Sequence, residues 1–362
     1  MAFKDRFYEI DLLRFLAALA VVLYHYTFRG FAEGGYSPVE YPVLGEFFKY
    51  GSYGVQLFFI ISGFVILMTA TKRDAAHFVI SRITRLYPAF WVCVTLTALA
   101  ILWKGGALFQ VDLVQYILNL SMVSGFIGVD MVDGVYWTLL VEIKFYALIF
   151  VLLILGQIHR VEWFLAFWLL LTAVSLVIPL PKIITFLFLT DWSAFFIAGA
   201  LFYLIRQHGL NLYRGGMLWA SFMVAIFENL RQLSHLEQMY NSYFSPLVTS
   251  LLILAFFVIF LLIALGKTQF FSSPHLVKLG ILTYPLYLIH QNIGFIIFHE
   301  VGESVNRYVL LAALVLIMMM AAWLIHKLIE QPLGKWMDKL LKHLWERFGF
   351  SVGKKKPVSQ GV

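Results

Sequence analysis

The chain has 362 residues, of which 61% are hydrophobic and 13% are charged. Soluble domains carry about 25% charged residues, so the composition excludes a soluble globular enzyme and predicts an all-α polytopic membrane protein. The formal net charge is +7, but its excess lies mostly in short loops and near the C-terminus, where it indicates membrane topology rather than a nucleic-acid partner.

Ten apolar runs are long enough to cross a bilayer, which takes about 20 residues. An eleventh run, 113–129, contains several polar residues and glycines and is predicted to be re-entrant or interfacial. With ten spans both termini are cytoplasmic, and most Lys and Arg fall inside, as the positive-inside rule requires. The weakest of the ten is 216–230, which ends near Glu228. The ten runs lie near 12–28, 53–70, 87–103, 137–155, 163–180, 184–205, 216–230, 246–265, 278–298 and 308–328.

The first predicted span carries three ionisable residues, Asp11, Arg14 and His25. Asp11 and Arg14 are three residues apart and can pair on one helix face. Arg14 and His25 share a face about 16 Å apart along the axis. An ionisable group deep in a bilayer is costly and indicates a functional site. The alternative is that His25 is a hydrogen-bonded packing residue.

Two further stretches indicate a ligand on the cytoplasmic side. Arg82 and Arg85 lie one helical turn apart just before Pro88, and paired guanidiniums suit a pyrophosphate because arginine binds phosphate in a bidentate manner. Topology charges or lipid anchors are the alternative for this pair. Ser62 and Gly63 are small residues in an aromatic span, where another helix or a slim ligand can approach the backbone.

Two later spans carry polar residues at membrane depth. Glu142 requires a partner there, which His25 or His290 could supply. Tyr136 and Trp137 precede it at the outer interface, as an aromatic belt or as a platform for a sugar ring.

These stretches, taken in order, resemble the acyltransferase-3 family of integral membrane acyltransferases. The resemblance rests on six motifs and covers residues 5–335. We therefore expect a transmembrane acyltransferase domain, 1–335, followed by a basic cytoplasmic tail, 336–362, as in stand-alone members. Many relatives have two adjacent acids where this chain has Glu142 and Ile143. The motifs are Arg14-x10-His25, Phe58-Phe-Ile-Ile-Ser-Gly-Phe64, Arg82-x-x-Arg85-Leu-Tyr-Pro88, Tyr136-Trp-Thr-Leu-x-x-Glu142, Tyr284-Pro-Leu-Tyr-Leu-Ile-His290 and Glu330-Gln-Pro332.

The resemblance implies acyl transfer across a bacterial inner membrane. An acyl-CoA, with acetyl-CoA the first choice, would bind from the cytoplasm at Arg14, Arg82, Arg85 and Ser62. The acceptor would be a hydroxyl of an envelope sugar, such as O-antigen, capsule or a lipid-linked sugar, presented from outside. Acceptor contacts are expected at three residues, and neither a metal nor a prosthetic group is expected. The three residues are Tyr136, Trp137 and His290.

The residues themselves allow a matching mechanism. A sugar hydroxyl needs a base, and neutral His25 can take its proton, a step typically worth about 10²–10⁴-fold in rate. Glu142 or Asp11 could orient the imidazole, as the third member of a triad does. Asp11 lies about 21 Å from His25 along the helix axis, so Glu142 is the better candidate. Whether His25 acts as base or as covalent acyl carrier is left open.

Two other functions remain possible for the same residues. A proton-coupled transporter or flippase could use deep His, Glu and Arg, although inverted repeats are not evident. A structural subunit of a glycan-assembly complex would use them to hold helices together. The outer loops 29–52 and 228–245 are expected to choose the acceptor, and the oligomeric state is left open. These loops contain Tyr36, Tyr41, Tyr240 and Tyr243.

Overall fold

The computed structural model describes residues 7–106, 108–271 and 273–347, and every regular element within these ranges is a helix. Within them, nine helical stretches are long and apolar enough to cross a membrane. The predicted class, an all-α polytopic membrane protein, is therefore confirmed. The nine stretches are Tyr8–Ala32, Pro42–Lys72, Ala75–Lys104, Gly134–Ile154, Ile158–Val177, Lys182–His208, Pro246–Ala264, Pro274–Val301 and Arg307–Arg347.

The expected ten spans differ from these nine at the 216–230 run. This run lies within α11 (Leu212–Tyr240), a helix of 29 residues that is long enough to cross but is not among the nine. Its second half carries Glu228 and Asn229, both buried against neighbouring helices. These polar side chains lower the apolar content of the helix, which explains why 216–230 was also the weakest run in the sequence.

The polar run 113–129 forms a short helix, α6 (Leu113–Asn119), and a 3-10 turn, η3 (Ser124–Ile127). A helix of seven residues is only about 10 Å long, so it cannot cross. The chain after α6 is held against α5 (Ala75–Lys104): the Tyr87 hydroxyl and Trp91 Nε1 donate to backbone carbonyls at 2.9 and 3.0 Å. This agrees with the prediction that the segment does not span the membrane.

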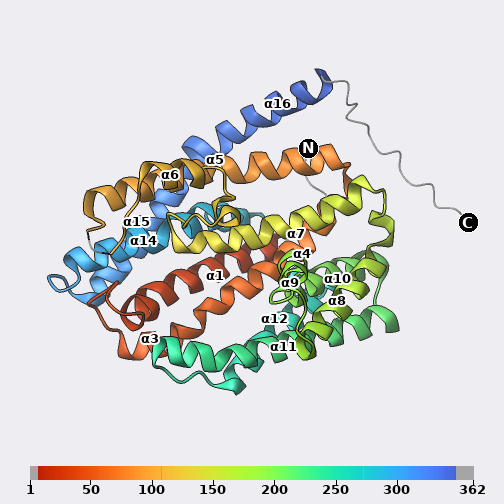
Figure 1. Ribbon diagram of the computed structural model, residues 1–362, viewed down its shortest axis with the longest axis horizontal. Helices are drawn as coiled ribbons and strands as arrows, with labels where there is room; N and C mark the ends of the chain where they lie inside the picture. The colour runs from red at the N-terminus through yellow and green to blue at the C-terminus, as the bar shows by residue number, and fades with distance from the viewer. Residues whose placement is uncertain (1–6, 107, 272, 348–362) are drawn as a thin grey trace, which may run out of the picture.

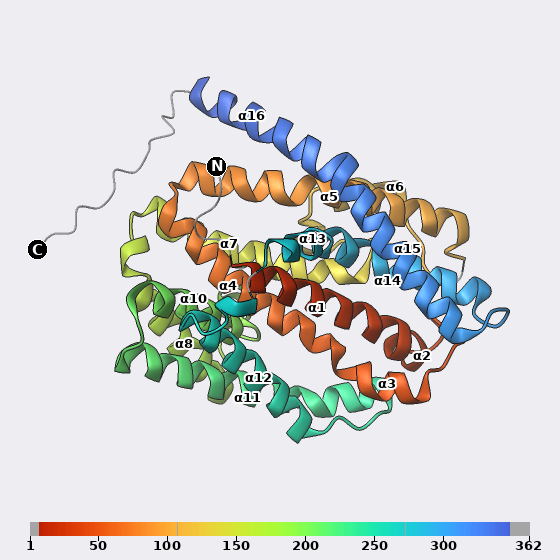
Figure 2. The same ribbon diagram turned by 180° about the vertical axis from the view of Figure 1, so that it is seen from behind.

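Five helices surround the centre of the molecule. α1 (Tyr8–Tyr24) lies between α4 (Gly54–Lys72) and α14 (Thr283–Val301), as both ribbon views show (Figures 1 and 2). α5 packs against α14, and α7 (Trp137–Ile154) packs against α4. A second group packs on the far side of α4, so α4 joins the two halves. It comprises α8 (Val161–Val177), α10 (Ser193–His208), α11 and α12 (Pro246–Ala264).

Glycine allows α4 and α10 to approach closely. A Cβ at Gly63 would collide with the carbonyl oxygen of Phe196, and a Cβ at Gly199 would collide with the carbonyl oxygen of Ile60. Small residues at such positions let helix backbones pack together in membranes. Gly63 therefore serves helix packing, while its neighbour Ser62 is left to face the other side of α4.

Two π-helical turns interrupt the spans. η1 (His25–Arg29) continues α1 into α2 (Gly30–Ala32), and η8 (His326–Glu330) joins α15 (Arg307–Ile325) to α16 (Gln331–Arg347). Single π turns inside α-helices occur frequently at functional sites. His25 begins one of these turns and Arg29 ends it.

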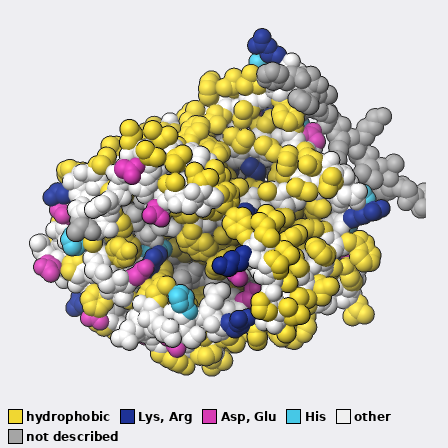
Figure 3. Space-filling model, viewed as in Figure 1, with side chains coloured by type: hydrophobic (Ala, Val, Ile, Leu, Met, Phe, Trp, Pro, Cys, Tyr) yellow, Lys and Arg dark blue, Asp and Glu magenta, His cyan; other side chains and the backbone are white. Residues whose placement is uncertain are grey.

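Hydrophobic side chains cover much of the molecular surface, as expected for helices that face lipid (Figure 3). Leu102, Trp103 and Val177 are among the exposed ones. The expected boundary between residues 335 and 336 falls inside α16, and residues 348–362 of the expected tail lie outside the described residues. The sidedness of the termini stays a prediction.

Candidate active site

The three arginines of the donor prediction line one cavity of about 130 Å³. Arg14 reaches it from α1, and Arg82 and Arg85 reach it from the first half of α5. Ser62 of α4 faces the same space, so the structure brings all four expected donor-binding residues together. We call this space the donor cavity. Its lining also includes Phe58, Thr138, Glu142, Tyr146 and Tyr287.

Carboxylates offset part of the positive charge at this cavity. The Arg85 Nη1 lies 2.5 Å from the Oε1 of Glu330, the last residue of the second π turn. The Arg14 Nη1 lies 3.9 Å from the Asp11 Oδ1. Arg82 lies over the ring of Tyr146, 5.9 Å from its centroid. Three guanidiniums around one space make a site suited to phosphate groups.

Glu142 belongs to the donor cavity rather than to His25. Its Oε1 accepts a hydrogen bond of 2.7 Å from the Ser62 hydroxyl, because α7 packs against α4 and brings these two side chains face to face. The orienting role expected for Glu142 toward His25 therefore has no contact to support it among the described bonds of either residue. The carboxylate instead presents an acceptor inside the cavity.

Tyr287 lines the donor cavity. Its hydroxyl lies 3.0 Å from the Thr138 hydroxyl, and its ring packs edge-on against Phe58 at 5.7 Å. The other face of this residue is turned toward His290, with ring centroids 5.7 Å apart. Tyr287 thus contacts both the donor cavity and His290.

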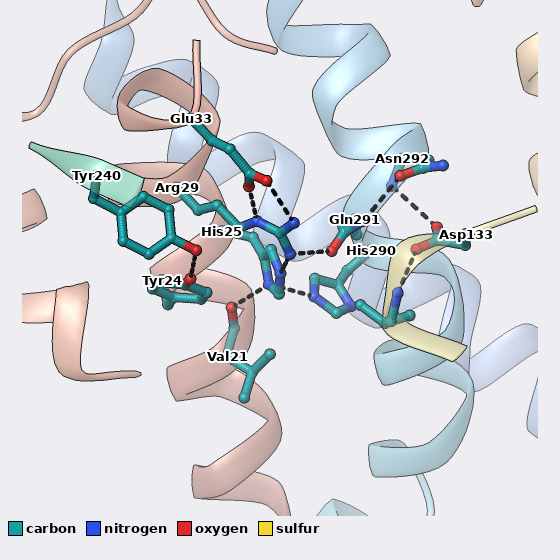
Figure 4. Close-up of polar contacts among 11 residues, drawn as sticks. Val21, Tyr24, His25, Arg29, Glu33, Asp133, Tyr240, His290, Gln291 and Asn292 are labelled. Carbon is teal, nitrogen blue, oxygen red and sulfur yellow. Dashed lines mark hydrogen bonds and ion pairs between the residues drawn. The ribbon is translucent and has the colours of Figure 1, made fainter. Parts of the chain in front are cut away.

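His25 and His290 form a hydrogen-bonded pair between η1 and α14 (Figure 4). The His25 Nδ1 lies 3.0 Å from the His290 Nε2 and 2.8 Å from the carbonyl oxygen of Val21. The His290 Nδ1 lies 2.8 Å from the carbonyl oxygen of Tyr287. A carbonyl only accepts, so each Nδ1 carries the proton and each Nε2 has a lone pair. The His25 Nδ1–H is shared between Val21 and His290.

The remaining lone pair of His25, on Nε2, faces Arg29. The Arg29 Nη1 lies 3.3 Å from this nitrogen and 3.1 Å from the Gln291 Oε1. Glu33 holds the rest of the guanidinium through Nε and Nη2. Sequence reasoning did not single out Arg29, although it follows His25 by four residues and so lies one turn further on the same face.

A buried acid, Asp133, bonds the backbone of α14 next to Gln291 of this network. Asp133 is fully buried and accepts hydrogen bonds from the backbone N–H groups of Asn292 (3.0 Å) and Val135 (3.1 Å). Burial raises the pKa of Asp133 to about 7, and the two N–H donors partly offset this shift. The Asn292 side chain in turn accepts from Gln291 at 3.0 Å. Asp133 therefore fixes the α14 segment that holds Arg29.

A second cavity, of about 360 Å³, opens beside the end of the first span. Its wall includes Tyr240, whose hydroxyl lies 2.6 Å from that of Tyr24, and the Tyr24 ring packs against His25 at 4.9 Å. The expected specificity loops meet here, because residues from both line the cavity. We call it the outer cavity, and its lining includes Phe28, Phe31, Glu40, Tyr41, Glu46 and Ser242.

The other expected site residues lie elsewhere. Asp11 is at the arginine end of α1, where it faces Arg14. Tyr136 is buried and packs against Phe90 at 5.2 Å, and Trp137 packs against Trp192 at 5.2 Å. These packing contacts account for both aromatic residues, so their acceptor role stays a prediction. Within the described residues, no cluster of three or more His, Cys, Asp or Glu is placed to hold a metal.

Known proteins are similar to parts of this chain. Nodulation protein 10 of Rhizobium leguminosarum bv. viciae is 29% identical over 161 residues, which cover 38% of this chain and 42% of that protein. "Putative membrane-bound transacylase BcsY" of Komagataeibacter xylinus is 31% identical over 175 residues, covering 43% and 40%. The matched regions therefore span less than half the length of these two relatives. No solved structure matches the chain.

The family comparison extends much further along the sequence. The profile of the acyltransferase-3 family, described as an acyltransferase domain, matches residues 7–327. This range includes both cavities and the histidine pair. The chain therefore belongs to the acyltransferase-3 family of membrane acyltransferases.

Proposed function

We propose that the protein transfers an acetyl group from cytoplasmic acetyl-CoA to a hydroxyl of an envelope sugar at the outer side of a bacterial inner membrane. One observation carries this proposal: a cavity lined by three arginines is also lined by Tyr287, whose ring packs against the histidine pair at His290. A transporter offers no reason for three guanidiniums around such a cavity. The name of one relative, a membrane-bound transacylase, is consistent with the proposal.

The donor cavity offers binding groups for two parts of an acyl-CoA. Arg14, Arg82 and Arg85 would bind its phosphates through charge-assisted hydrogen bonds. Ser62 and Glu142 line the same cavity, where a hydroxyl and a carboxylate can bind the amide groups of the pantetheine arm. The thioester would then stop at Tyr287, next to the histidine pair.

His25 is the general base in this mechanism. Its Nε2 has a lone pair that faces Arg29 in the resting structure, and a hydroxyl that approaches from the outer side would take the place of Arg29 and give its proton to this atom. The resulting imidazolium is stabilised by its Nδ1–H, which donates to Val21 and His290. His290 therefore takes the orienting role that the sequence assigned to Glu142. Covalent transfer through His25 would need the same lone pair.

The acceptor would bind in the outer cavity. Aromatic faces such as Phe31 and Tyr240, together with the carboxylates of Glu40 and Glu46, provide the apolar surface and the hydrogen-bond acceptors that a sugar requires. Tyr24 and Tyr240 lead from this cavity to the His25 ring. The acceptor, a surface glycan or lipid-linked sugar, would therefore reach the base without entering the donor cavity.

The proposal is tested with purified protein in nanodiscs. We would titrate acetyl-CoA by calorimetry for the wild type, for His25→Ala and for the double variant Arg82→Ala/Arg85→Ala. Radiolabelled acetyl transfer to the glycolipid fraction of the source organism's membranes is the transfer assay.

We expect His25→Ala to keep acetyl-CoA binding and to lose transfer. The double variant should bind acetyl-CoA at least tenfold more weakly, because a hydrogen bond to a charged group is worth about 1.5–3 kcal/mol. Arg160→Ala/Arg231→Ala, which removes two arginines outside the cavity, is the charge-matched control. Failure of folded wild type to bind acetyl-CoA would refute the proposed function.

A further inference from the structure

We propose that Arg29 is a second catalytic residue, whose guanidinium binds the oxyanion that forms when the hydroxyl attacks the thioester. This inference rests on the proposed acyl transfer. No motif in the sequence marks Arg29, and the donor cavity does not include it. Its position beside the lone pair of the base carries the inference.

Three neighbours hold the Arg29 guanidinium in one orientation (Figure 4). The two oxygens of Glu33 bind Nε and Nη2, a fork-to-fork arrangement that fixes the plane of the group. The Gln291 Oε1 accepts one hydrogen of Nη1 at 3.1 Å. The second hydrogen of Nη1 is thereby directed at the His25 Nε2, 3.3 Å away. Arg29 thus presents one preorganised donor where the reaction would occur.

The incoming hydroxyl releases this donor. When the hydroxyl binds the Nε2 lone pair, that lone pair is no longer available to Arg29. The freed N–H can then donate a hydrogen bond to the carbonyl oxygen of a thioester that meets the hydroxyl. Preorganised donors at such a position typically contribute about 10²–10³-fold to kcat.

The atoms and charges of the step balance. The hydroxyl proton moves to the His25 Nε2 while the hydroxyl oxygen bonds to the thioester carbon, and the carbonyl electrons form an alkoxide that Arg29 binds. The alkoxide then reforms the carbonyl and expels the CoA thiolate. The proton on Nε2 passes to the sulfur, giving free CoA and the acetylated sugar.

The charges around Arg29 are suited to this role. Glu33 offsets the cation in the resting protein, and this limits its repulsion of the imidazolium that forms on His25. The side-chain exposure of Arg29 is 24% and that of Glu33 is 25%, so the pair is partly open to solvent. A purely structural ion pair would need neither Gln291 nor the contact with His25.

The experiment compares Arg29→Ala, Arg29→Lys and Arg231→Ala with wild type in the transfer assay, together with acetyl-CoA titration and a thermal melt. Arg231 does not line the donor cavity. It lies over the Phe227 ring and donates a hydrogen bond to the Leu176 carbonyl, so it serves as the matched control. Methylguanidinium is added to Arg29→Ala to replace the lost side chain.

We expect Arg29→Ala to lower kcat about 10²–10³-fold, with acetyl-CoA binding unchanged. Arg29→Lys should lose about tenfold or more, because an ammonium lacks the planar fork, and methylguanidinium should restore part of the rate in Arg29→Ala. A folded Arg29→Ala with kcat near wild type overturns the inference, as does a loss confined to the acceptor KM. If Arg29→Ala does not fold, an unchanged kcat in Arg29→Lys overturns it. Absence of transfer by wild type would instead refute the proposed function.

Discussion

Replacing His290 with phenylalanine tests whether the histidine pair supports the base. His290 is fully buried, and phenylalanine fills a similar volume, so little cavity forms. The change removes the acceptor that lies 3.0 Å from the His25 Nδ1, while the Val21 carbonyl at 2.8 Å stays. His25→Phe is not an equivalent change, because it removes the base itself.

The expected effect follows from the charge that His25 gains. A hydrogen bond between neutral groups contributes about 0.5–1.5 kcal/mol, and one to a charged group contributes about 1.5–3 kcal/mol. Only the difference lowers the barrier, so the loss is about 1–2 kcal/mol, or about 5- to 30-fold in kcat at 1.36 kcal/mol per factor of ten.

The assay is acetyl transfer at saturating acetyl-CoA, with the KM for acetyl-CoA measured in parallel. His299→Phe, at the exposed end of the same helix, is the control and should behave as wild type. We expect His290→Phe to lower kcat and leave this KM within about twofold, because Tyr287 and not His290 lines the donor cavity. An unchanged kcat would show that the pair does not stabilise the imidazolium. A loss as complete as that of His25→Ala would show that His290 itself carries the proton.

Two further predictions concern stability. Gly63→Ala should lower the free energy of unfolding by about 1–3 kcal/mol, because the added methyl meets the α10 backbone, whereas Gly216→Ala, with open space around it, should be neutral or stabilising in the same thermal melt. Equal melting temperatures for both variants would contradict close packing of α4 and α10. Asp133 binds its proton more tightly in the folded protein, with a pKa of about 7 against 3.8, so its contribution is fully present below pH 3.8 and is lost as pH rises through 7. The loss amounts to about 4 kcal/mol at 1.36 kcal/mol per pKa unit. The variant Asp133→Asn should therefore show a smaller decline of melting temperature between pH 5 and 8 than the wild type. Parallel curves of melting temperature against pH for the two proteins would refute this.

The fold was largely predictable because each membrane-spanning helix requires a long run of apolar residues, which is visible in the sequence. The run 113–129 was correctly separated from the spans by its polar residues and glycines. The π turn at His25 could not be foreseen, because the widened turn depends on how neighbouring helices pack and leaves no compositional trace. Nor could hydropathy alone decide whether α11 spans the membrane. Its Glu228 is buried, and the sequence does not show which helices bury it.

Of the candidate site, only the donor cavity with its arginines was predictable from the sequence. Arg14, Arg82 and Arg85 converge because the topology placed all three at the same end of their helices. Glu142 was paired with His25 because both were expected at similar depth. The depth of a residue in the membrane does not determine which helices are neighbours. Because α7 packs against α4, the Glu142 carboxylate accepts a hydrogen bond from Ser62 instead. His290 was expected near the acceptor, and the structure places it in a hydrogen bond with His25.

The position of Tyr287 bears on how a donor and an acceptor from opposite sides can meet. This residue lines the donor cavity, where its hydroxyl bonds Thr138 and its ring packs against Phe58, and its ring also contacts His290. Under the proposed function, a thioester that reaches His25 has to pass this residue. The thioester end of the donor then meets the sugar hydroxyl at His25, while the phosphates of CoA stay at the arginines of the donor cavity.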